Sequence, residues 1–199
     1  MTRVASPSPR GAKRHATALS ARSAESALFL LGPHNINMWQ EHTVKILKIF
    51  IFMTKIISWN VNGIRAIEKK GFFEWLHKES PDVLCIQETK ADKSQLSETI
   101  LNQQGYESHW SSCRIKKGYS GVAVYTKIKP NKIEYGIGIE EFDQEGRFII
   151  LHFDAYILFN IYFPNGSSGN KRVPYKMSFY DAFYKHCQTL LNEGKKIIV

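Results

Sequence analysis

The chain has 199 residues, 43% of them hydrophobic and 23% charged, which fits one globular domain and excludes disorder throughout. Its formal net charge of +9 is uneven: residues 1–52 hold seven Lys and Arg against two acids, and residues 53–199 hold twenty against sixteen. The charge is therefore a weak argument for a nucleic-acid partner. The longest apolar run, 46–57, contains Lys48 and Lys55 and is too short to span a bilayer, so we expect no membrane helix.

The three cysteines, Cys85, Cys113 and Cys187, are odd in number and lack any C-x-x-C spacing. This pattern argues against a disulfide scaffold or a zinc site and favours a reducing, intracellular compartment. We expect the cytoplasm or nucleoid for a bacterial protein. An organelle or the nucleus is expected instead if residues 1–24 form a transit peptide.

The first part of the chain differs in composition from the rest. Residues 1–24 are rich in Arg, Ser, Ala and Pro and contain no acid, and from Gly32 to Phe52 the composition changes to Asn, Ile, Lys and Phe. Met53 then precedes the first well-patterned strand. We interpret residues 1–52 as an unstructured leader, which is either untranslated sequence before a start at Met53 or a transit peptide. Residues 53–199 form the predicted domain.

From Thr54 the sequence predicts alternating strands and helices. Residues 55–60 and 82–87 are predicted strands, and an amphipathic helix at 68–79 places Phe72, Trp75 and Leu76 inward, which gives a βαβ start. A second helix is predicted over 93–104.

The later part of the sequence predicts shorter strands at 106–113, 121–126, 132–135, 148–153 and 156–162. Their short links favour antiparallel pairing. A helix over 174–192 has Pro174 at its start and Gly194 after its end, and a further strand occupies 196–199. The predicted fold class is α/β, a layered sandwich of mixed sheets flanked by helices.

Two predicted strands end in polar residues that suit a metal ion. Asn60 terminates the row Ile56, Ser58, Asn60, and Glu88 terminates the corresponding row of the strand at 82–87. Oxygen ligands at strand ends suit Mg²⁺, which keeps several waters. A single residue of this kind is more often a turn or cap residue. The pair therefore carries the prediction of a metal site.

Other polar and basic residues follow later strands. Tyr162 ends the strand at 156–162 and could place a phenol, and Asn165 an amide donor, beside a phosphate, although strand-end tyrosines are more often packing residues. Tyr119 lies in a basic loop and could contact nucleic acid. A second basic cluster suits phosphate contacts, but both clusters fit solvated surface equally well. Its members are Lys171, Arg172 and Lys176.

From Thr54 to Val199 the sequence closely resembles the exonuclease III type of apurinic/apyrimidinic endonuclease, in the endonuclease/exonuclease/phosphatase superfamily. The resemblance rests on ordered motifs: S-W-N-V-N-G-I-R-A at 58–66, P-D-V-L-C-I-Q-E-T-K at 81–90, G-Y-S-G-V-A at 118–123, Y-G-I-G at 135–138, D-Q-E-G-R at 143–147 and Y-F-P-N-G at 162–166. It implies a DNase I-like fold.

The resemblance also implies a function. It implies cleavage of DNA 5′ to abasic sites, with 3′ to 5′ exonuclease activity as a second reaction, by a monomer that binds double-stranded DNA with abasic sites or 3′ ends. Mg²⁺, or Mn²⁺ in its place, is the implied cofactor, with Glu88 and Asn60 as its site. Tyr162 and Asn165 are the implied catalytic residues. The implied DNA contacts are Tyr119, Arg147, Arg172 and Lys176.

The resemblance covers only the first part of the family's sequence pattern. The segment 195–199 is similar to the strand before the family's G-D-x-N motif, and that motif, the general base and a later S-D-H motif are not in this sequence. We therefore expect about the first half of the fold, and a fragment with little nuclease activity. Two alternatives remain open: another phosphoesterase of the superfamily, acting on inositol phosphates or RNA, and a catalytically dead nucleic-acid-binding module.

Overall fold

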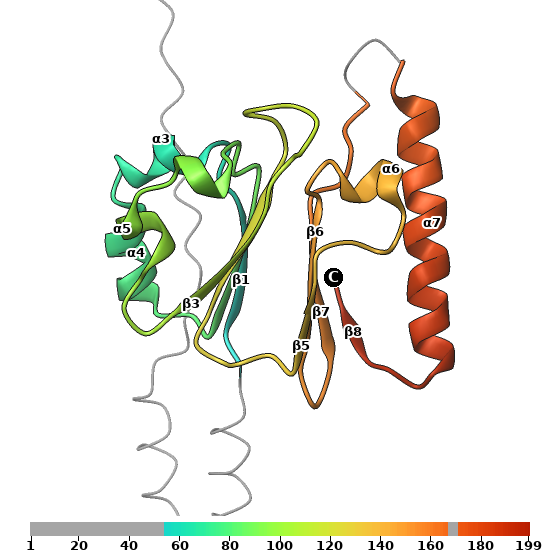
Figure 1. Ribbon diagram of the computed structural model, residues 1–199. Helices are drawn as coiled ribbons and strands as arrows, with labels where there is room; N and C mark the ends of the chain where they lie inside the picture. The colour runs from blue at the N-terminus through green and yellow to red at the C-terminus, as the bar shows by residue number, and fades with distance from the viewer. Residues whose placement is uncertain (1–53, 167–170) are drawn as a thin grey trace, which may run out of the picture. The chain divides into compact units, whose positions relative to one another are not determined.

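The computed structural model of the chain describes residues 54–166 and 171–199, which form two four-stranded β-sheets with helices (Figure 1). The predicted leader, 1–52, lies outside the described residues. The sheets have the strand orders β1-β2-β4-β3 and β5-β6-β7-β8. The mixed α/β sandwich predicted from the sequence is therefore confirmed.

The first sheet begins with the predicted βαβ unit. Strand β1 (Ile56–Asn60) runs parallel to β2 (Val83–Gln87), with Asn60 opposite Gln87. The helix predicted over 68–79 is the shorter α4 (Phe72–Glu79), and a separate helix that the sequence did not predict, α3 (Ile64–Glu68), precedes it. Gly71 explains the break, because its φ of 82° is left-handed and interrupts the helical backbone.

The single helix predicted over 93–104 is wrong. The chain forms a 3₁₀ turn, η2 (Lys93–Gln95), and a short helix, α5 (Glu98–Leu101). Asp92 accepts a hydrogen bond from the Ser94 amide (2.9 Å), and the Ser97 hydroxyl accepts one from the Ile100 amide (3.3 Å). Each side chain caps its own short element, and two caps so close together prevent one continuous helix.

The remaining strands of the first sheet are antiparallel to their neighbours. Strand β4 (Val122–Thr126) pairs with β2 on one side and with β3 (Glu107–Ser111) on the other. The predicted antiparallel pairing is confirmed here.

The second sheet follows in sequence. Strands β5 (Lys132–Glu134), β6 (Phe148–His152) and β7 (Ile157–Ile161) are antiparallel, and β8 (Ile197–Ile198) lies parallel to β7 after helix α7 (Val173–Asn192). Helix α6 (Glu140–Asp143), which the sequence did not predict, is a single turn held by buried Phe142. None of the helices in the described part of the chain has the length and apolar character needed to cross a bilayer.

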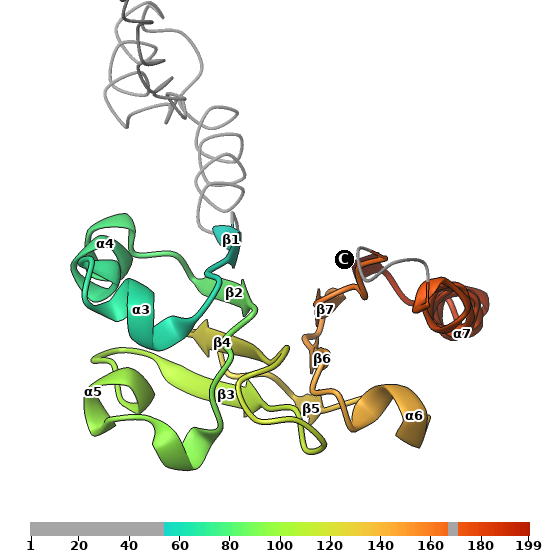
Figure 2. The same cartoon turned by 90° about the horizontal axis from the view of Figure 1, so that it is seen from above.

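Three apolar clusters fill the spaces between the helices and the sheets and between the two sheets. The first packs α4 and α5 on one face of the first sheet, and the second lies between the two sheets. The third packs α6 and α7 on the outer face of the second sheet, where the Phe148 and Phe179 rings stack with centroids 5.0 Å apart. Figure 2 shows the resulting order of helices, sheet, sheet and helices from above.

Asn160 makes a polar contact between the sheets. This β7 residue is 2% exposed, and its Nδ2 donates to the Ala123 carbonyl (2.8 Å) and the Ile86 carbonyl (3.2 Å) of the first sheet. Its Oδ1 accepts from Gln87 Nε2 (2.7 Å), which also donates to Ser58 Oγ (3.0 Å). Buried polar groups need such partners, so these bonds fix the position of β7 against β2.

Candidate active site

The structure brings the two predicted metal ligands together. Because Asn60 lies opposite Gln87 in a parallel pair, the next residue after β2, Glu88, lies beside the end of β1. Asn60 Nδ2 donates to Glu88 Oε1 at 2.7 Å. The two side chains therefore present a carboxylate and a carboxamide at one edge of the first sheet.

The backbone at this edge is unusual. Asn62, Glu88 and Lys90 have φ values of 49°, 53° and 51°, in the left-handed region that non-glycine residues seldom adopt. The Asn62 amide donates to Asn60 Oδ1 (3.1 Å). Such strained residues cluster at functional sites, where the surrounding structure holds them in place.

Lys90 is a member of the site that sequence reasoning missed. Its Nζ lies 2.9 Å from Glu88 Oε2 and also donates to Asn62 Oδ1. The signal was present in the Q-E-T-K segment, but no strand-end pattern marks Lys90, because its position depends on the left-handed turn. The ammonium group gives the Glu88 carboxylate a resident counter-charge.

The pKa of Glu88 is lowered by its neighbours. Burial by itself raises this pKa, but hydrogen bonds from Asn60, Lys90 and Tyr162 and the charge of Lys90 together lower it below the ordinary value of 4.5. Glu88 is thus ionised at neutral pH.

Tyr162, predicted as catalytic, lies beside Glu88 just after β7. Burial and the hydrogen bond to the Glu88 carboxylate raise the pKa of Tyr162 to about 12. Its backbone is held on both sides by Arg147: the Tyr162 amide donates to the Arg147 carbonyl (3.0 Å), and Arg147 Nη1 donates to the Tyr162 carbonyl (2.9 Å). The phenol is therefore neutral at physiological pH and acts as a hydrogen-bond donor.

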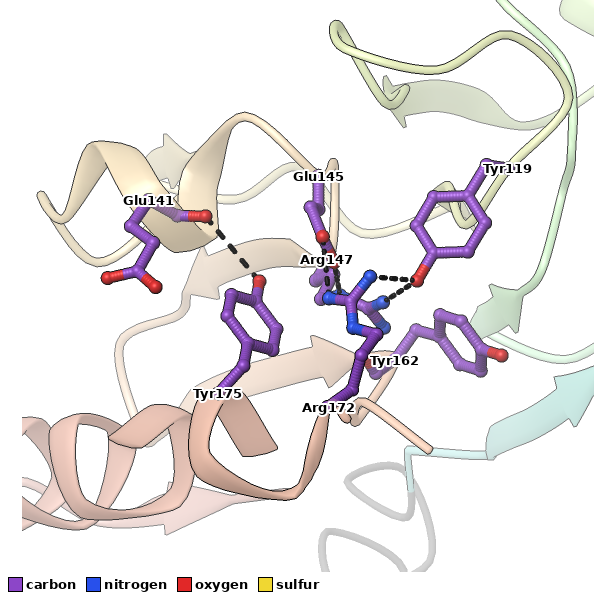
Figure 3. A network of polar contacts seen from close by, with 7 residues as sticks. All are labelled: Tyr119, Glu141, Glu145, Arg147, Tyr162, Arg172 and Tyr175. Atoms are coloured by element: carbon purple, nitrogen blue, oxygen red, sulfur yellow. Dashed lines mark hydrogen bonds and ion pairs between the residues drawn. The ribbon is translucent and has the colours of Figure 1, made fainter. Parts of the chain in front are cut away.

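The predicted DNA contacts Tyr119, Arg147 and Arg172 converge in one polar network (Figure 3). The Tyr119 hydroxyl accepts from Arg147 Nη2 (2.8 Å) and Arg172 Nη1 (2.9 Å). Both guanidinium groups also bind Glu145, which sequence reasoning did not select although it stands in the D-Q-E-G-R motif. Arg147 is 1% exposed, so its guanidinium faces protein groups, and its predicted DNA contact stays a prediction.

Asn165 and Lys176 flank a segment outside the described residues, 167–170. Asn165 is exposed, and Lys176 is half-buried in the first turns of α7. A Cβ built on Gly166 would lie 4.0 Å from Lys176 Cδ, so the lysine stem passes beside the residue that follows Asn165. The two residues thus lie near each other.

Gly121 allows the loop that contains Tyr119 to pack closely against the turn that contains Glu88. Its φ is 89°, and a Cβ at this position would collide with the Thr89 side chain. The close approach lets the Thr89 amide donate to the Gly121 carbonyl (3.0 Å) and the Lys90 amide to the Ser120 carbonyl (2.9 Å). The motif G-Y-S-G therefore has a backbone role beside the strained turn.

The donor chemistry of the Glu88 edge fits a hard divalent cation. Among the described residues, no group of three or more His, Cys, Asp or Glu side chains could enclose a metal. An ionised carboxylate beside a carboxamide still suits Mg²⁺, which is commonly bound through one or two carboxylates and retains waters. The residues present fit a metal ion held in part by water.

Comparison with known proteins shows that the chain is similar to nucleases. The chain is 43% identical over 145 residues to a DNA-(apurinic or apyrimidinic site) endonuclease of Dictyostelium discoideum, covering 72% of this chain and 40% of that protein. It is 40% identical over 146 residues to an exodeoxyribonuclease of Bacillus subtilis, covering 73% and 56%. The crystal structure of the Xenopus laevis APE2 catalytic domain matches with a TM-score of 0.66 and 29% identity, covering 72% and 56%.

The chain thus spans about half the length of the relatives it matches. The model of the Endonuclease/Exonuclease/phosphatase family matches residues 57–199, which include the second sheet, all of the first sheet except Ile56, and every described site residue. With the sandwich fold and the motifs at the strand ends, this match shows that the chain belongs to the Endonuclease/Exonuclease/phosphatase family.

Proposed function

We propose that this chain supplies part of a metal-dependent DNA phosphodiesterase site that cleaves the backbone 5′ to abasic sites. The convergence of Asn60, Glu88 and Tyr162 carries the proposal. The names of the relatives, an apurinic or apyrimidinic site endonuclease and an exodeoxyribonuclease, support this substrate and a 3′ to 5′ exonuclease reaction as a second activity.

Glu88 and Asn60 are the residues that would hold the cation, Mg²⁺ or Mn²⁺. A bound cation of this kind neutralises charge on phosphate oxygens and lowers the pKa of bound water. Glu88 suits this role because its lowered pKa keeps it anionic, and Asn60 fixes one of its oxygens through the 2.7 Å hydrogen bond.

Tyr162 and Asn165 serve as donors to the phosphate. The Tyr162 phenol, whose pKa is raised to about 12, keeps its proton at neutral pH. It therefore does not remove a proton from water, and when the substrate binds it donates to a phosphate oxygen in place of Glu88. The exposed Asn165 amide donates to a second oxygen. Donors placed in advance stabilise the charge that develops in the transition state.

Tyr119, Arg172 and Lys176 form the DNA-contacting side of the site, with Arg147 behind them. Arg172 and Lys176 are partly exposed and cationic, which suits contacts with the phosphates of double-stranded DNA by a monomer. Such contacts make binding fall as salt concentration rises.

The 199-residue chain by itself is expected to cut slowly. Among the described residues, Glu88 does not belong to any group of three or more His, Cys, Asp or Glu side chains that could hold a metal ion. Absence of a general base or an oxyanion donor costs a factor of about 10² to 10⁴.

The test measures metal binding and cleavage separately. We expect Mn²⁺ to broaden the NMR signals of the Tyr162 ring in the unchanged chain, and Glu88→Gln to abolish this effect. Cleavage of an abasic duplex is then measured with Mg²⁺ and with chelator, in the chain alone and in a chimaera completed with the C-terminal part of the Bacillus subtilis relative.

The matched control is Glu98→Gln, an exposed carboxylate on α5. In the chimaera, Glu88→Gln is expected to lower cleavage by about 10² or more, and Glu98→Gln to leave it unchanged. Equal cutting with chelator, or equal cutting of intact and abasic duplexes, contradicts the proposal. Salt-dependent DNA binding without cutting by the chimaera would favour a binding module instead.

A further inference from the structure

Glu145 lies at the centre of the polar network in Figure 3. Glu145 is 4% exposed. Its two carboxylate oxygens bind different arginines: Oε2 lies 2.6 Å from Arg147 Nε, and Oε1 lies 2.7 Å from Arg172 Nη2. Burial by itself raises the pKa of Glu145, but these hydrogen bonds and charges lower it below its ordinary value. The carboxylate is therefore ionised, and each of its oxygens has a cationic partner.

The two arginines connect parts of the fold that are distant in sequence. Arg147 lies just before β6, Arg172 is the residue that precedes α7, and Tyr119 lies in the loop between β3 and β4 of the other sheet. Each guanidinium donates to the Tyr119 hydroxyl, and Arg147 also donates to the Tyr162 carbonyl. The Arg147 guanidinium lies 4.9 Å from the Tyr162 ring centroid.

We propose that Glu145 is a positioning residue of this site: its buried carboxylate holds Arg147 and Arg172 in the arrangement that fixes Tyr119 and Tyr162. The inference rests on the proposed function in giving Tyr162 a role beside the phosphate. It goes beyond that function by assigning Arg147 to the support of Tyr162.

Charge explains why Glu145 would have this effect. Two guanidinium groups that share one phenol acceptor repel each other, and arginine cannot lose its proton in a protein. The carboxylate between them offsets that repulsion. Without it, one arginine is expected to move toward solvent, and Arg172 is the freer of the two, since its side chain is 31% exposed and that of Arg147 is 1% exposed.

The first experiment observes the tyrosines directly in the full chain. Chains labelled with ¹³C in the tyrosine rings are compared by NMR, and the two signals are assigned with Tyr119→Phe and Tyr162→Phe. Glu145→Gln, which keeps the shape and removes the charge, is expected to shift the signals of both Tyr119 and Tyr162. Glu145→Asp, which keeps the charge but is too short to reach both arginines, is expected to shift Tyr119 most.

The control is Glu140→Gln, on the neighbouring helix α6, which removes the exposed ion pair between Glu140 and Arg114. It should leave both tyrosine signals in place. A merely stabilising role for Glu145 would lower the unfolding midpoint but leave the tyrosine signals unmoved at temperatures where the variant is folded. That result overturns the proposal.

Tyr119→Phe provides a second variant if Glu145→Gln does not fold. It removes only the shared acceptor, so the Arg147 guanidinium loses one partner and the Tyr162 signal is expected to shift. An unmoved Tyr162 signal in a folded Tyr119→Phe chain overturns the coupling.

Cleavage by the completed chimaera gives a separate readout. Glu145→Gln is expected to lower kcat by about 10- to 100-fold, as for a misplaced catalytic group, with a smaller change in KM. If the unchanged chimaera cuts no DNA, the proposed function fails, whereas the NMR result still decides the role of Glu145.

Discussion

Tyr162 has a phenol whose acidity depends on the carboxylate beside it. Burial and the hydrogen bond to Glu88 raise its pKa from the ordinary 10.0 to about 12. A neutral phenol favoured in the folded state stabilises the fold below pH 10, and this contribution is lost as the pH rises through the folded pKa. Tyr162 is thus a donor throughout the physiological range.

We predict that Glu88→Gln moves the pKa of Tyr162 from about 12 toward 10.0, because it removes the negative charge that disfavours the phenolate. The measurement is a pH titration of ring-labelled tyrosine by NMR. Glu98→Gln, at an exposed position on α5, is the control and should leave the titration of Tyr162 unchanged. An identical Tyr162 titration in both variants contradicts the geometry described for Glu88.

The sequence predicted some site residues and missed others for a physical reason. Asn60, Glu88 and Tyr162 end apolar strands, so alternation alone marked them, and the motifs supported the choice. Lys90 and Glu145 were missed because their partners are set by a left-handed turn and by the packing of loops. Local patterns contain neither kind of information.

At the scale of elements, strand positions were predicted closely and short helices were not. The predicted strands at 82–87 and 148–153 correspond to β2 (Val83–Gln87) and β6 (Phe148–His152). Buried strands give clear apolar rows. The segment 93–104 failed because Asp92 and Ser97 cap separate turns, and cap geometry outweighed helix propensity there.

Asn160 is the buried residue through which β7 hydrogen-bonds to the first sheet. Asn160→Leu is expected to lower the free energy of unfolding by about 2–4 kcal/mol, since it removes the buried hydrogen bonds of Asn160 with Gln87 and with the carbonyls of Ile86 and Ala123. Urea unfolding followed by circular dichroism measures the change.

The control for Asn160 is Asn131→Leu, at an exposed position where the side chain donates to Asp154. It is expected to change the free energy of unfolding by less than about 0.5 kcal/mol. Similar losses in the two variants would mean that the buried hydrogen bonds of Asn160 contribute little.

At the scale of the whole molecule, three glutamates with lowered pKa values connect stability to pH. The pKa values of Glu88, Glu134 and Glu145 all lie below the ordinary 4.5: burial raises each, and hydrogen bonds together with the charges of basic neighbours more than offset it. Lowered pKa values in the folded state stabilise the protein above pH 4.5, and this contribution is lost as the pH falls through the folded values.

We therefore predict that the contribution of these carboxyl groups to the free energy of unfolding stays nearly constant from pH 7 to about pH 5 and decreases steeply below the ordinary carboxyl pKa of 4.5. Urea titrations at a series of pH values measure this. The pH dependence of Glu145→Gln should be shallower than that of the unchanged chain. A free energy that does not change between pH 6 and pH 3 would show that the three carboxyl groups are not held as described.

The left-handed backbone at Glu88 gives the site a second requirement besides its carboxylate. A replacement there changes both the available ligand and the ease of forming the turn. Asn adopts this backbone readily, whereas Val, with its branched β-carbon, does so only with strain. Glu88→Asn thus removes the carboxylate and spares the turn, and Glu88→Val disturbs both. None of the residue types that adopt this backbone easily has a carboxylate on a side chain as long as that of glutamate. A substitution at position 88 that relieves the backbone strain therefore also removes the glutamate carboxylate from the site.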